Sequence, residues 1–148
     1  MKKESRRSFV KKTAAITTGV ITSNLPIQSF ANVGENKKLK LALVGCGGRG
    51  SGAAVQALSA DDNIELIAVS DVFRDRVESS LKGINDHFGD SKKIKIKEKN
   101  IFIGFDGYKN AIDQCDVVIL TTPPGFRPLH FEYAIRNDKH VFMEKPLA

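Results

Sequence analysis

Residues 40–50 read Lys40-Leu41-Ala42-Leu43-Val44-Gly45-Cys46-Gly47-Gly48-Arg49-Gly50, and they determine which fold the chain adopts. The first half, 40–44, is a short apolar run that ends at glycines, as expected of a buried strand in a parallel sheet. The second half fits the pattern Gly-x-Gly-x-x-Gly. Small and apolar residues from 51 to 60 follow and predict a helix. A glycine pattern between a strand and a helix is typical of a dinucleotide-binding loop.

Each glycine of this pattern has a physical task in such a loop. Gly45 permits a tight turn, Gly47 lets backbone amides approach a pyrophosphate, and Gly50 permits close packing of the helix against the strand. The start of the helix adds unpaired N–H groups and the positive end of its dipole. The sequence therefore predicts that the cofactor phosphates contact Gly45, Gly47, Gly48, Arg49 and Gly50.

An acidic residue follows the second predicted strand, which covers residues 64–69. Asp71 lies 21 residues after Gly50, where a carboxylate accepts hydrogen bonds from ribose hydroxyls and repels a 2′-phosphate. This favours NAD over NADP as the cofactor. Arg74 offers the opposite charge, so binding a 2′-phosphate or stacking on adenine stays open for it. The structural alternative for Asp71 is a cap for a helix that begins at Val72.

The rest of the chain alternates between predicted helices and strands. Apolar residues at 77, 81, 84 and 88 recur with the period of a helix that has one buried face. The lysine-rich residues 91–100 predict an exposed connection. Further strands are expected at 101–105, 116–120 and 140–143, and further helices at 108–113 and 127–137. Such repeated units imply an α/β fold with a doubly wound parallel sheet, the Rossmann fold, with right-handed crossovers.

The cysteines and histidines predict neither a disulfide nor a metal site. Cys46 follows the first predicted strand and Cys115 precedes the fourth, so parallel strands place the two sulfurs at opposite edges of the sheet. A strand the length of 40–44 spans roughly 16 Å, and a disulfide tolerates a Cα separation of only about 7 Å. The three scattered histidines have no metal-ligand spacing. They are His87, His130 and His140.

The last quarter of the chain carries a family resemblance. Residues 121–124 read Thr-Thr-Pro-Pro, His130 follows, and residues 139–146 read Lys-His-Val-Phe-Met-Glu-Lys-Pro. With the glycine loop, these motifs resemble the Gfo/Idh/MocA family, which includes glucose–fructose oxidoreductase and inositol dehydrogenase, over residues 39–148. The resemblance implies an NAD(P)-dependent oxidoreductase that transfers a hydride between a sugar or polyol hydroxyl and a tightly bound cofactor.

The same resemblance implies roles for individual residues. Lys145 is expected near the nicotinamide and the reacting hydroxyl, where it hydrogen-bonds the substrate oxygen and relays its proton. Glu144 is expected to orient the lysine or the nicotinamide side, the alternative being a solvated pair at a strand end. Thr122 and Pro123 are expected to border the cofactor. His130 matches the family pattern, and a catalytic and a structural role both stay open for it.

The basic charge of the chain lies at its N-terminus. The 148 residues have a formal net charge of +6, with 41% hydrophobic and 27% charged residues, as in an ordinary soluble fold. Residues 1–31 hold six basic residues and one acidic residue, so the remainder carries only +1. A nucleic-acid-binding surface needs its positive excess on the folded domain. Nucleic acid is therefore excluded as a partner.

Residues 1–31 have the order of an export signal: a charged start, an apolar middle and a small-residue site at 29–31. Residues 5–11, Ser-Arg-Arg-Ser-Phe-Val-Lys, resemble the twin-arginine motif, and the alternative is a generic basic start. The apolar middle is short and broken by Pro26, whereas a membrane span needs about 20 apolar residues. We expect a signal peptide over 1–31, a linker over 32–38 and the Rossmann domain over 39–148. The folded protein is expected to be exported by the twin-arginine machinery to a periplasmic or other extracytoplasmic location.

Three functions stay open on this basis. The first is the sugar or polyol oxidoreductase. Because free NAD is scarce outside the cytoplasm, the second is an NAD-dependent glycosidase that works in a redox-neutral cycle. The third is a dinucleotide-binding module without catalysis. In the family, a substrate domain follows the Glu-Lys-Pro motif, so we expect this sequence to be truncated before that domain and the full-length protein to be a homo-oligomer.

Overall fold

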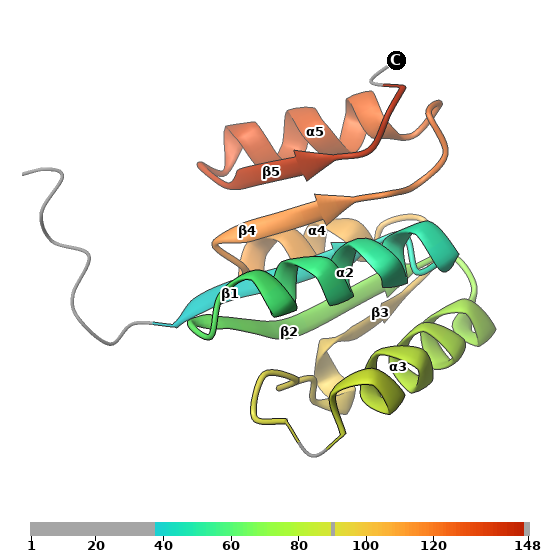
Figure 1. Cartoon of the computed structure of the whole chain (residues 1–148). Helices are drawn as coiled ribbons and strands as arrows, with labels where there is room; N and C mark the ends of the chain where they lie inside the picture. The colour runs from blue at the N-terminus through green and yellow to red at the C-terminus, as the bar shows by residue number, and fades with distance from the viewer. Residues whose placement is uncertain (1–37, 90, 147–148) are drawn as a thin grey trace, which may run out of the picture. The chain divides into compact units, whose positions relative to one another are not determined.

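The computed structural model describes residues 38–89 and 91–146 (Figure 1). They belong to one compact unit, and the predicted signal peptide and nearly all of the predicted linker lie outside the described residues. None of the helices in the described part is long and apolar enough to cross a membrane. The elements are β1 (Leu39–Val44), α2 (Gly48–Ala60), β2 (Ile64–Asp71), α3 (Arg74–Phe88), η1 (Glu98–Asn100), β3 (Ile101–Ile103), α4 (Gly107–Gln114), β4 (Val117–Leu120), α5 (Arg127–Arg136) and β5 (His140–Met143).

The strands form one parallel sheet in the order β3-β2-β1-β4-β5. The chain moves from β1 outward through β2 to β3 and then returns to the other side of β1 with β4. This reversal between β1 and β4 is the switch point at which doubly wound folds bind their ligands. The predicted doubly wound α/β fold is therefore confirmed.

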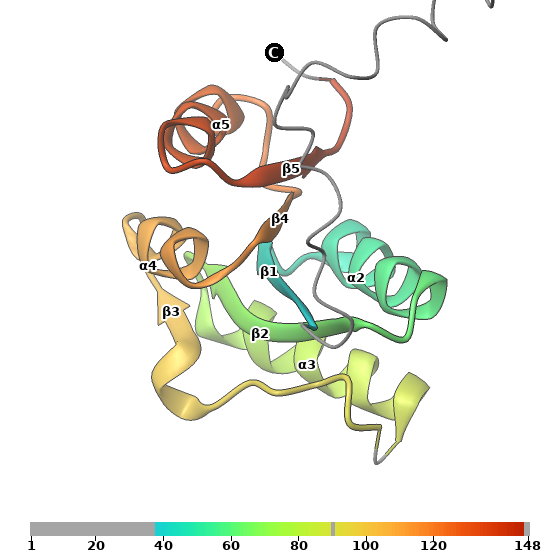
Figure 2. The ribbon, with the colours of Figure 1, turned by 90° about the vertical axis from the view of Figure 1, so that its left-hand side faces the viewer.

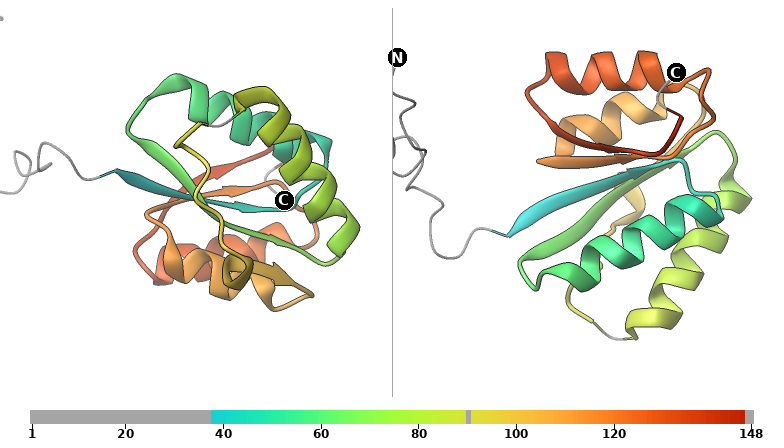
Figure 3. Two further views of the ribbon diagram at one scale, coloured as in Figure 1. Left: turned by 90° about the horizontal axis from the view of Figure 1, so that it is seen from below. Right: turned by 45° about the horizontal axis from the view of Figure 1, so that its top comes forward.

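Helices cover both faces of the sheet (Figures 2 and 3). Alternate residues of β1 point to opposite faces, so Leu41 and Leu43 pack toward α2 and α3, whereas Ala42 and Val44 pack toward α4 and α5. Two hydrophobic clusters result, one on each side of the sheet. Because β1 pairs in parallel with both β2 and β4, the carboxyl ends of these three strands lie at the same edge of the sheet.

The boundaries of several predicted elements differ from the structure. Helix α2 begins at Gly48 rather than at Ser51, because glycines 48 and 50 adopt the helical conformation in its first turn. Strand β2 extends through Asp71. Strand β3 ends at Ile103 rather than at 105, because Gly104 has a φ of +104° and turns the chain.

The prediction of an exposed connection over residues 91–100 is wrong for part of that segment. Ile94 forms a bridge with Leu66, and Ile94 and Ile96 pack against the cluster on the α2 side of the sheet. The ammonium group of Lys93 donates hydrogen bonds to the carbonyl oxygens of Leu58 and Asp61 at the end of α2. The prediction rested on the high lysine content of the segment and overlooked the two isoleucines between the lysines.

Cys46 and Cys115 are both free, as the strand geometry predicts, and both are buried. Burial raises the pKa of the Cys46 thiol to about 12 and that of Cys115 to about 11. Both side chains therefore stay protonated at neutral pH and behave as small apolar groups.

Candidate functional site

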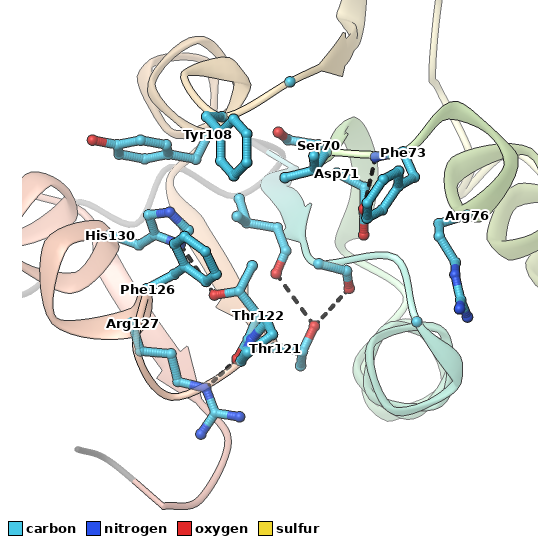
Figure 4. A pocket seen from close by; sticks show the side chains of 17 residues that line it. Ser70, Asp71, Phe73, Arg76, Tyr108, Thr121, Thr122, Phe126, Arg127 and His130 are labelled. Carbon is cyan, nitrogen blue, oxygen red and sulfur yellow. Dashed lines mark hydrogen bonds between the residues drawn. The ribbon is translucent and has the colours of Figure 1, made fainter.

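A cavity of about 540 Å³ opens at the carboxyl ends of the strands, at the switch point of the sheet (Figure 4). The loops after β1, β2, β3 and β4 line it, together with the first turns of α3, α4 and α5. Six of the predicted site residues lie in this lining: Gly45, Gly47, Asp71, Thr122, Pro123 and His130. The other six lie outside it: Gly48, Arg49, Gly50, Arg74, Glu144 and Lys145.

Gly45 and Gly50 are required by the fold itself. Gly45 has a φ of +97°, and a Cβ atom there would lie 2.7 Å from the backbone nitrogen of Thr122. A Cβ atom at Gly50 would lie 2.0 Å from the carbonyl oxygen of Gly45. Both distances are far below van der Waals contact. The tight turn predicted for Gly45 and the close helix–strand packing predicted for Gly50 are therefore confirmed.

Gly47 and Gly48 are not required by the fold in this way, because a Cβ atom at either position would meet no atom of another part of the chain within 4 Å. Gly47 is the N-cap of α2, with no side-chain cap, and the first turn of the helix holds no acidic residue. The first backbone N–H groups of a helix have no intrahelical acceptor, and they carry the positive end of the dipole. This helix start has the open space and the donors that the pyrophosphate of a dinucleotide requires.

The Asp71 carboxylate faces the glycine loop. Its Oδ2 accepts a hydrogen bond from the Cys46 amide at 2.7 Å, and its Oδ1 accepts one from the Phe73 amide at 3.1 Å. Helix α3 begins only at Arg74, with Phe73 as its N-cap, so Asp71 is not the cap of a helix that starts at Val72. A carboxylate has about four acceptor positions, so Asp71 keeps acceptor capacity toward the cavity for ribose hydroxyls.

Arg76, rather than the predicted Arg74, lies in the cavity lining. Arg74 Nη1 lies 3.7 Å from Glu98 Oε1, and Arg74 is not part of the cavity lining. Arg76, two residues further along α3, does line the cavity. Two helical residues turn the side-chain direction by roughly 200°. The position of the helix start, rather than the distance from Asp71, was the signal that could have identified Arg76.

Two threonines after β4 connect the walls of the cavity. The hydroxyl of Thr121 donates to the carbonyl oxygen of Gly45 at 2.6 Å and lies 3.2 Å from that of Val44, which joins the ends of β1 and β4. The hydroxyl of Thr122 lies 3.1 Å from Nδ1 of His130. The Thr122-Pro123 segment thus borders the cavity at its α5 side.

His130 lies in the first half of α5 and is buried among aromatic rings (Figure 4). Its ring centroid is 4.2 Å from that of Tyr108 and 6.3 Å from that of Phe126. Burial lowers the pKa of His130 to about 4, so the imidazole is neutral at neutral pH. This environment suits a hydrogen bond to Thr122, and the catalytic role of His130 stays a prediction.

Glu144 and Lys145 follow β5 and have different surroundings. Glu144 is buried, and its Oε1 accepts a hydrogen bond from Arg49 Nη2 at 2.5 Å. That hydrogen bond lowers the pKa of Glu144 below its usual range, against the opposing effect of desolvation. Lys145 is exposed. The interpretation of the two residues as a solvated pair is therefore wrong for Glu144.

Several residues that line the cavity were not identified from the sequence. Phe73, Phe105 and Phe126 are exposed aromatic residues of its lining, and the rings of Phe105 and Phe126 are 6.1 Å apart. Arg127 is buried and donates from Nε to the carbonyl oxygen of Thr122. No spacing rule singles out these positions. Only the fold brings the loop after β3 next to the start of α5.

Comparisons with known proteins agree with this geometry. The model of a family described as an oxidoreductase family with an NAD-binding Rossmann fold matches residues 39–148. The chain is 27% identical over 154 residues to a glycosyl hydrolase family 109 protein of Solibacter usitatus, covering all of this chain and 34% of that protein. It is 25% identical over 162 residues to an α-N-acetylgalactosaminidase of Shewanella oneidensis, covering 97% of this chain and 34% of that protein.

Solved structures show the same fold. An oxidoreductase from Thermotoga maritima has a TM-score of 0.54 and 27% identity, over 75% of this chain and 31% of that one. The myo-inositol dehydrogenase from Lactobacillus casei, solved with NAD(H) and myo-inositol, has a TM-score of 0.59 and 19% identity, over 75% of this chain and 29% of that one. The chain spans about a third of the length of these proteins.

Proposed function

Because the chain belongs to the Gfo/Idh/MocA family of oxidoreductases with an NAD-binding Rossmann fold, we propose that the protein oxidises a sugar or polyol hydroxyl with NAD. The observation that carries the proposal is the uncapped start of α2 next to the Asp71 carboxylate, at the edge of one cavity. The helix start provides donors for a pyrophosphate, and Asp71 provides acceptors for a ribose.

NAD is proposed as the cofactor rather than NADP. The Asp71 carboxylate lies in the cavity lining, where it disfavours a 2′-phosphate, whereas Arg74 is held by Glu98. Arg76 is the residue that favours NADP, since it is a cation in the cavity lining. Similar structures contain either cofactor: the inositol dehydrogenase binds NAD(H), and a 3-ketoreductase from Actinomadura kijaniata was solved with NADP. When bound, NAD supplies the hydride acceptor.

Lys145 is the proposed catalytic residue. It follows β5 on the same edge of the sheet as the loop after β4, because β4 and β5 are parallel and the Glu144 amide donates to the carbonyl oxygen of Leu120. The Lys145 side chain at that edge can hydrogen-bond the substrate oxygen and, in its neutral amine form, accept the hydroxyl proton as the carbinol is oxidised. Glu144, fixed by Arg49, supports the strand end from which Lys145 projects.

A redox-neutral glycosidase is the second candidate, and the curated relatives favour it. Several of them are glycosyl hydrolase family 109 proteins, and one is an α-N-acetylgalactosaminidase. In such a cycle a sugar hydroxyl is oxidised, the aglycone is eliminated, water adds, and the ketone is reduced again. The cofactor returns to its starting state, which suits a protein that carries its NAD with it.

Export is part of the proposal. The twin-arginine motif at residues 5–11 and the small-residue site at 29–31 support transport of the folded, cofactor-loaded protein to the periplasm. Changing Arg6 and Arg7 together to lysine should retain the precursor in the cytoplasm. Equal periplasmic amounts of the variant and the native protein would contradict the twin-arginine route.

The experiment that tests the function has two stages. Calorimetric titration of the chain with NAD and NADP should show binding of NAD, and the absence of binding to both nucleotides would overturn the whole proposal. The full-length protein is then incubated with free polyols and with aryl glycosides. Net NADH from a polyol supports the oxidoreductase, and aglycone release without net NADH supports the glycosidase. Nucleotide binding without either activity would contradict both enzymatic functions and support a dinucleotide-binding module without catalysis.

A further inference from the structure

Arg127 is a buried cation that joins the two loops of the proposed active site. It is 6% exposed, and it begins α5. Its Nε donates to the carbonyl oxygen of Thr122, and its Nη1 donates to the carbonyl oxygens of Glu144 and Pro146, each at 2.5 Å. Two of these acceptors belong to the residues on either side of Lys145. The third belongs to the loop after β4 that borders the cavity.

The stability of α5 does not explain this arrangement. A positive charge in the first turn of a helix lies at the positive end of the dipole, where it is unfavourable. Burying a charged side chain adds a desolvation cost, which only well-formed hydrogen bonds offset. A residue that breaks a local rule in this way marks a functional or a strained site. The compensating gain at Arg127 is the connection between the main chain at Thr122 and the main chain around Lys145.

We propose that Arg127 is the positioning residue of the active site: its guanidinium fixes Lys145 relative to the dinucleotide cavity by binding the main chain on both sides of that lysine. This inference rests on the proposed function, since it takes Lys145 as the catalytic group. The planar guanidinium presents several donors in a fixed geometry, and here two of its nitrogens reach acceptors on two different loops. A shift of about 1 Å in a catalytic group costs up to about a hundredfold in rate.

The consequence is a separation between cofactor binding and catalysis. The helix start of α2 and Asp71 do not contact Arg127 in the hydrogen bonds that hold them. Loss of the guanidinium should therefore leave the helix start of α2 and Asp71 in place for NADH, while Lys145 moves away from the bound nucleotide. Because Arg127 also lines the cavity, the NADH affinity of each variant is measured first. In the full-length protein, kcat should fall by a larger factor than KM for NAD changes.

The test is lysine-selective acetylation of the chain, with mass-spectrometric quantification at Lys145 in the absence and presence of saturating NADH. In the native chain, NADH should protect Lys145. Arg127→Met should lose that protection even at an NADH concentration that saturates it, and Arg127→Lys, which keeps the charge but lacks the planar guanidinium with its several donors, should protect Lys145 only in part. If Arg127→Met does not fold, as judged by circular dichroism, Arg127→Lys decides the result.

Lys93→Met is the matched control, because the Lys93 ammonium group also donates to main-chain carbonyl oxygens, those of Leu58 and Asp61, and none of these residues lines the cavity. It should lower the melting temperature and leave the protection of Lys145 intact. Full protection in a folded Arg127→Met or Arg127→Lys chain would overturn the positioning role. A native chain that binds no NADH, or binds it without protecting Lys145, would instead overturn the proposed function.

Discussion

The carboxylate of Asp71 accepts a hydrogen bond from the backbone amide of Cys46 at 2.7 Å, which joins the end of β2 to the glycine loop after β1. The same side chain lies in the lining of the cavity. One carboxylate therefore holds the glycine loop and lines the cavity. Two substitutions separate the effects of this side chain: one removes both its charge and its hydrogen-bond acceptors, and the other removes the charge but keeps an acceptor.

Asp71→Ala should weaken NAD binding by about tenfold or more, because it removes the acceptors for the ribose and a charged hydrogen bond to the loop, worth roughly 1.5–3 kcal/mol. Asp71→Asn keeps an acceptor but removes the charge. It should bind NAD moderately less well and raise the affinity for NADP relative to NAD, because the 2′-phosphate is no longer repelled. Calorimetric titration with both nucleotides checks this, and an unchanged affinity ratio would contradict the ribose assignment.

The four glycines of the loop should fall into two classes when each is replaced by alanine. Gly50→Ala places a Cβ atom 2.0 Å from the carbonyl oxygen of Gly45, so backbone must move. We expect a loss of roughly 1–3 kcal/mol or more in the free energy of unfolding. Gly47→Ala meets no protein atom within 4 Å and should leave the unfolding free energy nearly unchanged.

The same Gly47→Ala chain should nevertheless bind NAD less well, because the added methyl group occupies the space next to the helix start that the pyrophosphate uses. Urea denaturation and nucleotide titration on the same samples separate the two effects. A stable Gly50→Ala chain would contradict the close contact in the structure. Normal NAD affinity in Gly47→Ala would show that the phosphates bind elsewhere.

The sequence predicted the fold well because its strongest signals are local. An apolar strand, a glycine loop and a helix follow one another within residues 40–60, and the alternation continues to Met143. The cavity was predicted only in part. Gly45, Asp71 and Thr122 lie in recognisable motifs, whereas the aromatic residues Phe105 and Phe126 meet only after the chain has crossed the sheet.

Arg127 shows why such residues escape a sequence-based analysis. Its partners are carbonyl oxygens, which every residue possesses, so no pattern of side chains marks the interaction. The prediction for Arg74 failed for a related reason, because the start of α3 at Arg74 rather than at Val72 changes which arginine lines the cavity. Helix boundaries are the least certain part of a prediction from sequence, and side-chain direction depends on them.

The ion pair between Arg49 and Glu144 should make the stability of the chain depend on acid. The folded pKa of Glu144 is lowered from 4.5, first by the hydrogen bond from Arg49. A depressed carboxyl pKa contributes stability that is fully present above the unfolded value and is lost as the pH falls through the folded value. The free energy of unfolding should therefore fall below about pH 4.5 more steeply in the native chain than in Glu144→Gln.

Chemical denaturation at a series of pH values between 3 and 7 measures this difference. Glu132→Gln is the matched control, because Glu132 forms an exposed ion pair with Arg136 on α5, and exposed pairs contribute little. It should follow the native curve throughout. Parallel curves for the native chain and Glu144→Gln would show that the Arg49–Glu144 contact does not persist in solution.

His130 should titrate with a pKa of about 4, because its ring is buried against Tyr108 and Phe126. A histidine whose folded pKa lies below its unfolded value of 6.5 contributes stability that is present above pH 6.5 and is lost as the pH falls toward 4. His130→Asn keeps a polar group near Thr122 without a titrating ring, so it should lack this part of the pH dependence. Proton NMR of the imidazole resonances measures the pKa directly. A pKa near 6.5 for His130 would mean that the ring is solvated, and it would then be available as a proton-transfer group at neutral pH, which a pKa near 4 disfavours.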